Sequence, residues 1–197
     1  EYLARYLTQQ GKKTAVLTRG YTSCAGCCGE STADEPRMMQ QHLGGIPVLV
    51  DPDRIRSAQK AVGEFQTDTV ILDDGLQQWH IRKDVEIVTI DATNPFGNGF
   101  LLPRGILRQP LQTLKDADIF VITHADQCCG SLGDLKRRLH ELNSRAVCCE
   151  AVHLPRGWYE LGDPGRQWDS ASVQKEPVGL FCGIGNPESF RRSVEAQ

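Results

Sequence analysis

Charged side chains stand directly after four of the short apolar stretches in this chain. They are Arg19, Asp73, Asp74, Asp91 and Asp126. In an open parallel sheet, ligands bind outside the carboxyl ends of the strands. If each apolar stretch is such a strand, these four carboxylates and one guanidinium converge on a single edge. The pattern therefore predicts a polar site built from strand ends.

The pair Asp73-Asp74, followed by Gly75, carries the strongest chemical signal. Two adjacent carboxylates repel each other, which raises one pKa unless a cation is bound. Magnesium prefers carboxylate oxygen, and nucleotide-using enzymes hold Mg²⁺ on an Asp that ends an apolar strand. The alternative is structural, because Asp after a strand is also a common turn or cap residue.

A second acidic pair, Asp34-Glu35, precedes Pro36 at a predicted helix start. Acids in the first turn complement the helix dipole, which is sufficient reason for one of them. The pair also follows a long Gly-rich loop, residues 22–33. One acid can therefore serve as general base for a hydroxyl while the other lies near the metal.

The segment of residues 92–110 contains too many Gly, Pro and Asn residues for regular structure, so it is predicted to be a long shaped loop. Arg104 and Arg108 lie within it. Forked guanidinium groups can clamp a phosphate. The alternative is that both arginines are simply solvated.

Apolar stretches of strand length alternate with stretches of helical periodicity along most of the chain, which predicts an α/β fold with a mostly parallel sheet and helices on both faces. Strands are predicted at residues 14–18, 46–50, 69–72, 85–90, 119–123 and 146–149, and helices near residues 2–7, 35–43, 53–65 and 132–142. We expect a core of residues 1–151, a linker of residues 152–176, and the start of a smaller α/β lobe at 177–197, with its first strand at 178–182.

Composition argues against a nucleic-acid-binding protein, a membrane-spanning protein and a disulfide-rich protein. The chain has 197 residues and a formal net charge of −3, which gives no general reason to expect a nucleic acid partner. No run approaches the roughly 18 apolar residues of a membrane-spanning helix. Six of the eight cysteines form adjacent pairs, which favours reduced thiols. Cys24 and Cys27 have zinc-knuckle spacing, but no second ligand pair stands at a suitable distance.

Five motifs occur in one order along nearly the whole chain. They are T-R-G-Y at 18–21, D-E-P at 34–36, D-D-G-L-Q at 73–77, F-G-N-G followed by L-P-R-G-I-L-R-Q-P at 96–110, and G-I-G-N-P at 183–187. Taken together they resemble the tetraacyldisaccharide 4'-kinase family of lipid A biosynthesis. The sequence departs from the family pattern at Ala33, Leu76, Gln78 and Gln109.

The resemblance implies a P-loop NTPase-like fold, ATP and Mg²⁺ as cofactors, and a tetraacyldisaccharide 1-phosphate lipid as acceptor at the cytoplasmic face of the inner membrane. It leaves the oligomeric state unknown. It also implies roles for individual residues: Asp34 and Arg19 in catalysis, Asp73 and Gln77 in nucleotide binding, Glu35, Asp73 and Asp74 as the magnesium group, and Tyr21, Asn98, Arg104 and Arg108 in substrate binding.

The family's phosphate-binding G-x-x-x-x-G-K-T would precede residues 1–7, and its D-H-H histidine would follow Gln197. We therefore expect this chain to be inactive alone. The acyl chains of the acceptor require apolar surface, for which Phe96, Phe100, Leu101 and Leu102 are candidates, with core packing as the alternative.

Two other functions compete with the kinase. The tetrapeptide T-H-A-D at residues 123–126 resembles the base-reading N-K-x-D of GTP-binding switch proteins, but it lacks the Lys. The second competing function is a non-enzymatic thiol or metal module built on the cysteines. A switch would prefer GTP without any lipid acceptor, and a metal module would hold stoichiometric zinc.

Overall fold

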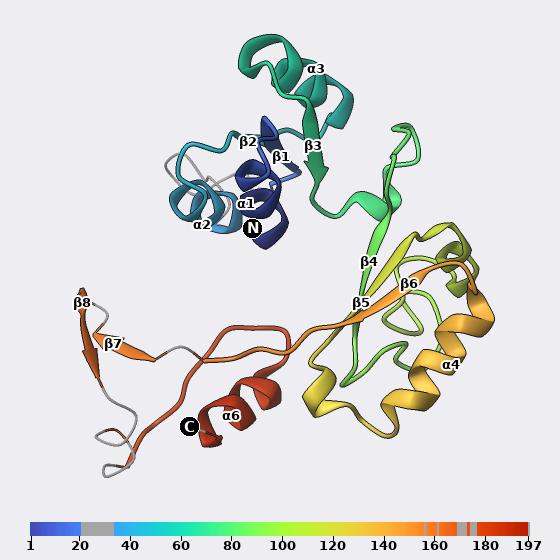
Figure 1. Cartoon of the computed structure of the whole chain (residues 1–197). Helices are drawn as coiled ribbons and strands as arrows, with labels where there is room; N and C mark the ends of the chain where they lie inside the picture. Colours follow the sequence, from blue (N-terminus) through green and yellow to red (C-terminus); the bar gives the residue numbers. More distant parts are fainter. Residues whose placement is uncertain (21–33, 156, 161, 169–172, 174–176, 197) are drawn as a thin grey trace. The chain divides into compact units, whose positions relative to one another are not determined.

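The computed structural model describes residues 1–20, 34–155, 157–160, 162–168, 173 and 177–196 (Figure 1). The chain divides into two compact units, Glu1–Asp84 and Val85–Gln197. Each unit contains its own parallel sheet of three strands. The predicted α/β class is therefore confirmed.

The first unit alternates helices and strands around the central strand β1. Its elements are α1 (Tyr2–Gln9), β1 (Thr14–Thr18), α2 (Asp34–His42), β2 (Val48–Val50), α3 (Arg54–Phe65), β3 (Thr69–Leu72) and the short 3-10 helix η1 (Gly75–Gln77). The strand order is β2-β1-β3, and β1 pairs in parallel with both neighbours. All five residues of β1 are buried, as expected for a central strand.

Helices cover both faces of this first sheet because successive strand residues point to opposite sides. On one face, Val16 packs with Ala4 of α1 and with Leu43, which follows α2. On the other face, Leu17 packs with Ala61 of α3. The start of α3 is fixed by Asp53, whose carboxylate accepts from the backbone N–H groups of Ile55 and Arg56 at 3.0 and 3.1 Å.

The second unit contains a second parallel sheet and a separate hairpin. Its elements are β4 (Ile87–Asp91), η2 (Leu111–Asp116), β5 (Ile119–Thr123), η3 (Ala125–Gln127), α4 (Leu132–Leu142), β6 (Val147–Glu150), β7 (Trp158–Glu160), β8 (Asp163–Trp168) and α6 (Pro187–Glu195). The strand order is β4-β5-β6, and β7 pairs antiparallel with β8. Phe120 and Ile122 of β5 are fully buried in the core of this unit.

The side chain of Asn143, at the end of α4, makes buried hydrogen bonds within the second unit. Its side-chain amide donates to the carbonyls of Leu114, Lys115 and Ala117 at 3.0, 3.1 and 2.8 Å. Its oxygen accepts from the backbone N–H groups of Arg145 and Ala146. One buried side chain thereby satisfies several loop groups that water does not reach.

The predicted elements of residues 1–151 are present with shifts of at most two residues at most ends, and residues 92–110 form a loop without helix or strand. The predicted strand at 178–182 is wrong. This segment is exposed coil, and a strand requires a partner that no described residue supplies to it. The passage predicted to be a linker holds the β7-β8 hairpin. The structure divides the chain between Asp84 and Val85. The domain boundary expected near residue 151 stays a prediction.

Candidate functional site

The carboxyl edge of the first sheet collects three charged residues. Arg19 follows β1, Asp51 follows β2 and Asp73 follows β3. Because the three strands are parallel and hydrogen-bonded to one another, the residues that follow them share one edge. The register supports this arrangement, since the backbone N–H groups of Asp51 and Asp73 donate to the carbonyls of Thr18 and Leu17 at 3.1 and 2.9 Å.

Asp73 is held in place by the last residue of the central strand. The hydroxyl of Thr18 donates to Oδ2 of Asp73 at 3.0 Å, and Thr18 is itself buried. A carboxylate oxygen that accepts one hydrogen bond keeps a second lone pair for a cation. The Asp73 carboxylate is therefore oriented by the fold and retains the capacity to coordinate a metal.

Arg54, in the first turn of α3, lies under this edge with only 3% of its surface exposed. Its Nη1 donates to the Asp51 carbonyl at 2.5 Å, and its Nη2 makes a longer contact of 3.5 Å with the Asp73 carbonyl. Its Nε finds no hydrogen-bond partner among the described residues. The guanidinium thus joins the ends of β2 and β3.

The electrostatic surroundings of Arg54 show which charges gather here. Burial lowers the pKa of the Arg54 guanidinium, and the charge of Asp73 acts in the opposite direction. Arg19 lowers the same pKa further, and Asp74 raises it. Arg19, Asp73 and Asp74 are therefore all within electrostatic range of one buried cation. Of the five groups predicted to converge on a single edge, Arg19, Asp73 and Asp74 belong to the first unit. Asp91 ends β4 and Asp126 follows β5, two strands of the separate sheet in the second unit.

Two backbone positions at this edge require unusual geometry. Gly20 has φ +64°, and a Cβ added there would lie 2.4 Å from Cγ1 of Val50. Asp74 adopts the left-handed conformation with φ 56°, which non-glycine residues rarely do. Such strained residues cluster at functional sites. The chain therefore turns sharply just after β1 and just after β3.

Asp51 is engaged in a structural ion pair. Its two carboxylate oxygens accept from Nε and Nη2 of Arg56 at 2.7 and 2.8 Å. The hydrogen bond from Arg56 is the main reason that the pKa of Asp51 is lowered, and the backbone N–H of Asp53 adds to it. This forked pair fixes the loop between β2 and α3.

Of the other residues predicted for this site, some lie in the described part of the chain and some do not. Glu35 is exposed in the first turn of α2, and Gln77 is half-buried at the end of η1. Asp34 begins α2, but its side chain lies outside the described part of the chain, as does all of Tyr21. Their roles therefore stay predictions.

The second unit holds the predicted substrate residues of the long loop. The side chain of Asn98 braces this loop, because its amide donates to the Arg104 carbonyl at 2.9 Å and its oxygen accepts from the Phe100 N–H at 3.2 Å. The Arg104 guanidinium lies 3.6 Å from the centre of the Phe100 ring. Arg108 is exposed. A phosphate clamp by the two arginines stays a prediction.

A second polar cluster lies at the carboxyl edge of β4 and β5. Oδ1 of Asp91 accepts from the backbone N–H and the hydroxyl of Thr93 at 2.9 and 2.7 Å. Burial raises the pKa of Asp91, but these two hydrogen bonds and the nearby His124 outweigh it, so the pKa is lowered overall. The Asp91 carboxylate is therefore held in its charged form.

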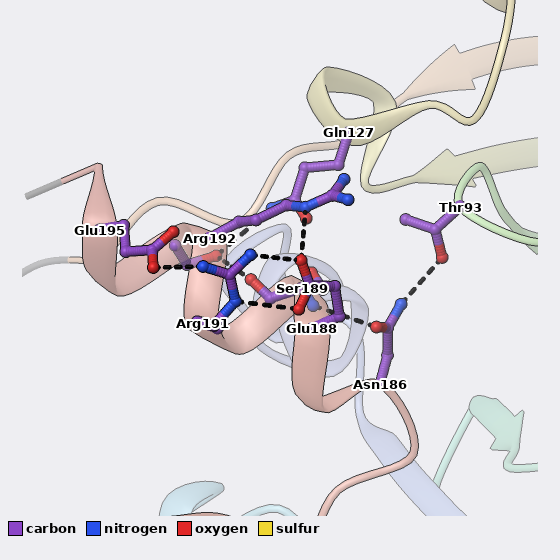
Figure 2. A network of polar contacts seen from close by, with 9 residues as sticks. Thr93, Gln127, Asn186, Glu188, Ser189, Arg191, Arg192 and Glu195 are labelled. Atoms are coloured by element: carbon purple, nitrogen blue, oxygen red, sulfur yellow. Dashed lines mark hydrogen bonds and ion pairs between the residues drawn. The ribbon is translucent and has the colours of Figure 1, made fainter. Parts of the chain in front are cut away.

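His124 and Asn186 extend this cluster. Nδ1 of His124 lies 3.2 Å from Oδ1 of Asp91, but not in hydrogen-bonding geometry. The amide of Asn186 donates to the Thr93 hydroxyl at 2.8 Å, while its oxygen caps α6 by accepting from the Ser189 N–H at 3.0 Å (Figure 2). One side chain thus connects α6 to the end of β4.

Exposed ion pairs on α6 complete the network in Figure 2. Glu188 pairs with Arg191 and Arg192, and Arg191 also pairs with Glu195. The hydrogen bond from Arg191 is the main reason that the pKa of Glu188 falls to about 2. Because these side chains are solvated, they support the helix only weakly.

Sequence reasoning missed Asp51, Arg54 and the Asn186–Thr93 contact. Asp51 follows a predicted strand, so the rule that found Asp73 would have found it as well. Arg54 carried no recognisable signal, because an Arg after an N-cap is ordinary on a helix surface. The partners Asn186 and Thr93 are 93 residues apart, and no local pattern joins them.

The donor chemistry of the first edge fits Mg²⁺. Among the described residues there is no group of three or more His, Cys, Asp or Glu side chains arranged to hold a metal ion. Magnesium does not need one, because it is usually bound by one or two carboxylates together with water and substrate phosphates. Asp73 and Asp74 supply such a pair. Cys24 and Cys27, which have zinc-knuckle spacing without a second ligand pair, lie outside the described part of the chain.

Comparison with known proteins gives one consistent result. The family model described as tetraacyldisaccharide-1-P 4'-kinase matches residues 1–197. The tetraacyldisaccharide 4'-kinase of Halothermothrix orenii is 36% identical over 98% of this chain and 56% of its own length. That of Syntrophus aciditrophicus is 34% identical over 98% of this chain and 57% of its own length. The chain therefore spans about half the length of the curated relatives it matches.

A similar fold is found in a crystal structure described as the "apo" form of LpxK from Aquifex aeolicus in complex with ATP. The TM-score is 0.56 with 22% sequence identity, over 82% of this chain and 69% of that one. At this identity the similarity shows the fold alone, and it confirms the predicted P-loop NTPase-like class.

Proposed function

Because the chain belongs to the tetraacyldisaccharide-1-P 4'-kinase family, we propose that the protein transfers the terminal phosphate of ATP to the 4'-hydroxyl of a tetraacylated glucosamine disaccharide 1-phosphate. The observation that carries this proposal is the gathering of Arg19, Asp73 and Asp74 around the buried Arg54. Phosphoryl transfer depends mainly on positioning and charge neutralisation, and this edge of the sheet offers both.

Asp73 and Asp74, with Glu35, are the residues that would hold Mg²⁺. When bound, Mg²⁺ neutralises charge on the terminal phosphates of ATP. The contribution of the chain is to orient the carboxylates beforehand. Thr18 fixes Asp73 by the 3.0 Å hydrogen bond, and the left-handed turn at Asp74 sets the direction of the backbone.

In the reaction the 4'-oxygen of the sugar attacks the terminal phosphorus of ATP. A new P–O bond forms, the bond from that phosphorus to the bridging oxygen breaks, and ADP leaves. Asp34 takes the proton of the 4'-hydroxyl. Arg19 stabilises negative charge on the transferring group, and the buried Arg54 keeps the ends of β2 and β3 together beneath it.

The lipid acceptor requires both anion recognition and apolar contact. Arg104 and Arg108 would bind phosphate, and Asn98 shapes the loop that carries them. Tyr21, for which the family resemblance implies a substrate-binding role, lies outside the described residues. Of the candidate acyl-chain contacts, Phe96 is only 5% exposed, so core packing is its role. Phe100, Leu101 and Leu102 are exposed and stay candidates.

We place the protein at the cytoplasmic face of the inner membrane, as a peripheral protein, because its acceptor is a lipid. Within the described residues, no helix has both the length and the apolar character needed to cross a bilayer. The switch alternative is not favoured, because the family model and the relatives at 30–36% identity are kinases.

The proposal is tested by kinase assays on the full-length protein with Asp73→Asn and Asp74→Asn. Each change removes a negative charge from the metal group while keeping its size, and we expect kcat to fall by about a hundredfold or more. Asp68→Asn is the matched control. Asp68 is an exposed acid at the opposite end of β3, and its replacement is expected to leave kcat within about twofold. Normal kcat in both site variants would refute the proposal.

A further inference from the structure

Residues 99–107, which we call the apolar loop, present large hydrophobic side chains to solvent. Phe100, Leu101, Leu102 and Ile106 are 42%, 43%, 63% and 56% exposed. Phe96, only four residues before Phe100, is buried. The protein can therefore bury side chains of this segment, yet it leaves four neighbouring ones uncovered. Several large apolar side chains exposed within one short loop indicate an interaction surface.

The apolar loop is braced by its own backbone. The N–H of Gly105 donates to the Leu101 carbonyl at 2.9 Å, that of Leu107 to Phe100 at 3.2 Å, and that of Leu102 to Leu107 at 3.0 Å. Asn98 adds two side-chain bonds at the base. Because the loop is already ordered, docking costs little conformational entropy.

Gly105 makes this fold of the loop possible. A Cβ at that position would lie 2.1 Å from the Phe100 carbonyl oxygen, which no side chain could tolerate. The close approach of the two loop arms therefore requires glycine. It leaves the apolar side chains at the outside of the loop. A groove of about 400 Å³ lies beside them, lined in part by Leu101, Leu107 and Leu111.

The charge of this region indicates what covers it. From residue 92 to residue 115 the sequence contains no Asp or Glu, but it contains Arg104, Arg108 and Lys115. The Arg104 guanidinium stacks on the Phe100 ring at 3.6 Å, so a cation and an apolar side chain share one position at the tip. An apolar loop that carries a cation and stands in a stretch of sequence without acids matches an anionic lipid surface.

We infer that the apolar loop is the segment that docks the protein onto a bilayer containing anionic phospholipid. Phe100, Leu101, Leu102 and Ile106 enter the boundary between headgroups and acyl chains, while Arg104 and Arg108 contact headgroup phosphates. This inference rests on the peripheral membrane location proposed above and adds the part of the chain that makes the contact. The loop would then lie where a lipid acceptor enters from the bilayer.

The test is vesicle co-sedimentation of the full-length protein without ATP or acceptor. Vesicles of phosphatidylcholine are compared with vesicles that also contain 30% phosphatidylglycerol, a composition chosen to add about one negative charge per three lipids. We expect binding to the anionic vesicles, weaker binding in high salt, and at least about tenfold weaker binding for the double variant Phe100→Ser/Leu102→Ser.

The matched control is Phe65→Ser/Leu154→Ser, which removes the same two residue types from exposed positions outside the loop. Phe65 is 44% exposed and Leu154 is 79% exposed. The control is expected to bind like the unchanged protein. Equal binding by the Phe100→Ser/Leu102→Ser protein would overturn the role of the loop. If the unchanged protein did not bind vesicles, the membrane location itself would be overturned. A loop that binds a protein partner instead of lipid would give this absence of vesicle binding. Kinase activity does not enter either readout.

Discussion

Arg54 explains why two strand ends of the first sheet stay together. A planar guanidinium can donate to two carbonyls in different directions at once, whereas a lysine ammonium on a flexible chain has no such fixed fork. The carbonyls of Asp51 and Asp73 are the acceptors. Burial lowers the pKa of the Arg54 guanidinium, and the negative charges of Asp73 and Asp74 act against that lowering. Arg54 supports the site without belonging to any of the recognisable motifs.

Replacing Arg54 by Met is expected to lower the free energy of unfolding by about 2–4 kcal/mol, because buried acceptors and carboxylates lose their partner. Urea unfolding followed by circular dichroism measures the change. Arg56→Met is the control, since Arg56 is largely exposed and pairs with Asp51 at the surface. Its cost should stay below about 1 kcal/mol. Equal losses in the two variants would contradict the role given to burial.

Thr93→Val tests the cause of the lowered pKa of Asp91. The hydroxyl of Thr93 donates to Asp91, and valine keeps the shape but not the donor. The pKa of Asp91 should therefore rise toward or above the ordinary value of 3.8. Carbon-13 NMR titration of the carboxyl group measures it. An unchanged midpoint would mean that other groups hold the charge.

The same shift predicts how stability depends on pH. A carboxyl group whose pKa is lowered by folding stabilises the protein above its unfolded pKa, and this contribution disappears as the pH falls through the folded pKa. The difference in stability between the original protein and Thr93→Val should thus be full above about pH 5 and shrink in stronger acid. A difference that persists at pH 2 would show that it arises from packing instead.

Among the helices and strands, β1 is the element that local patterns describe best. Its five apolar or small residues follow a glycine stop signal, and the structure begins and ends the strand where the sequence predicts. The segment 178–182 is just as apolar but forms no strand. The difference is the partner: β1 pairs on both sides, whereas nothing in the described chain pairs with 178–182. Propensity alone cannot supply a neighbouring strand.

Two glycines of the first unit should respond oppositely to alanine. Gly63 lies inside α3 with no atom within 4 Å of an added Cβ, so Gly63→Ala should stabilise by about 0.5–1 kcal/mol. Gly20 has φ +64° and faces Val50 at 2.4 Å, so Gly20→Ala should destabilise by more than about 1 kcal/mol. Thermal unfolding of both variants provides the measurement. Stabilisation by Gly20→Ala would contradict the geometry of the turn after β1.

For the molecule as a whole, the sequence predicts the alternation of elements and the polar strand ends, because both depend on local spacing. It does not predict the contacts between distant segments. Asn186 reaches Thr93 across 93 residues, and Arg54 joins two strand ends that only the folded sheet brings together. Such contacts depend on the path of the whole chain, and a single sequence carries no local signal for them.

The catalytic proposal also depends on the whole molecule, because the chain spans about half the length of its curated relatives. What this chain contributes is the acidic edge of the first sheet. The proposed metal binding by Asp73 and Asp74 can be examined apart from the lipid acceptor, because that measurement requires only a divalent ion and ATP.

The most direct measurement is electron paramagnetic resonance of Mn²⁺, used in place of Mg²⁺, with ATP and the full-length protein. We predict bound Mn²⁺ for the unchanged protein and for Asp68→Asn, and at least about tenfold weaker binding for the double variant Asp73→Asn/Asp74→Asn. Unchanged Mn²⁺ affinity in that double variant would contradict the assignment of this edge as the metal site.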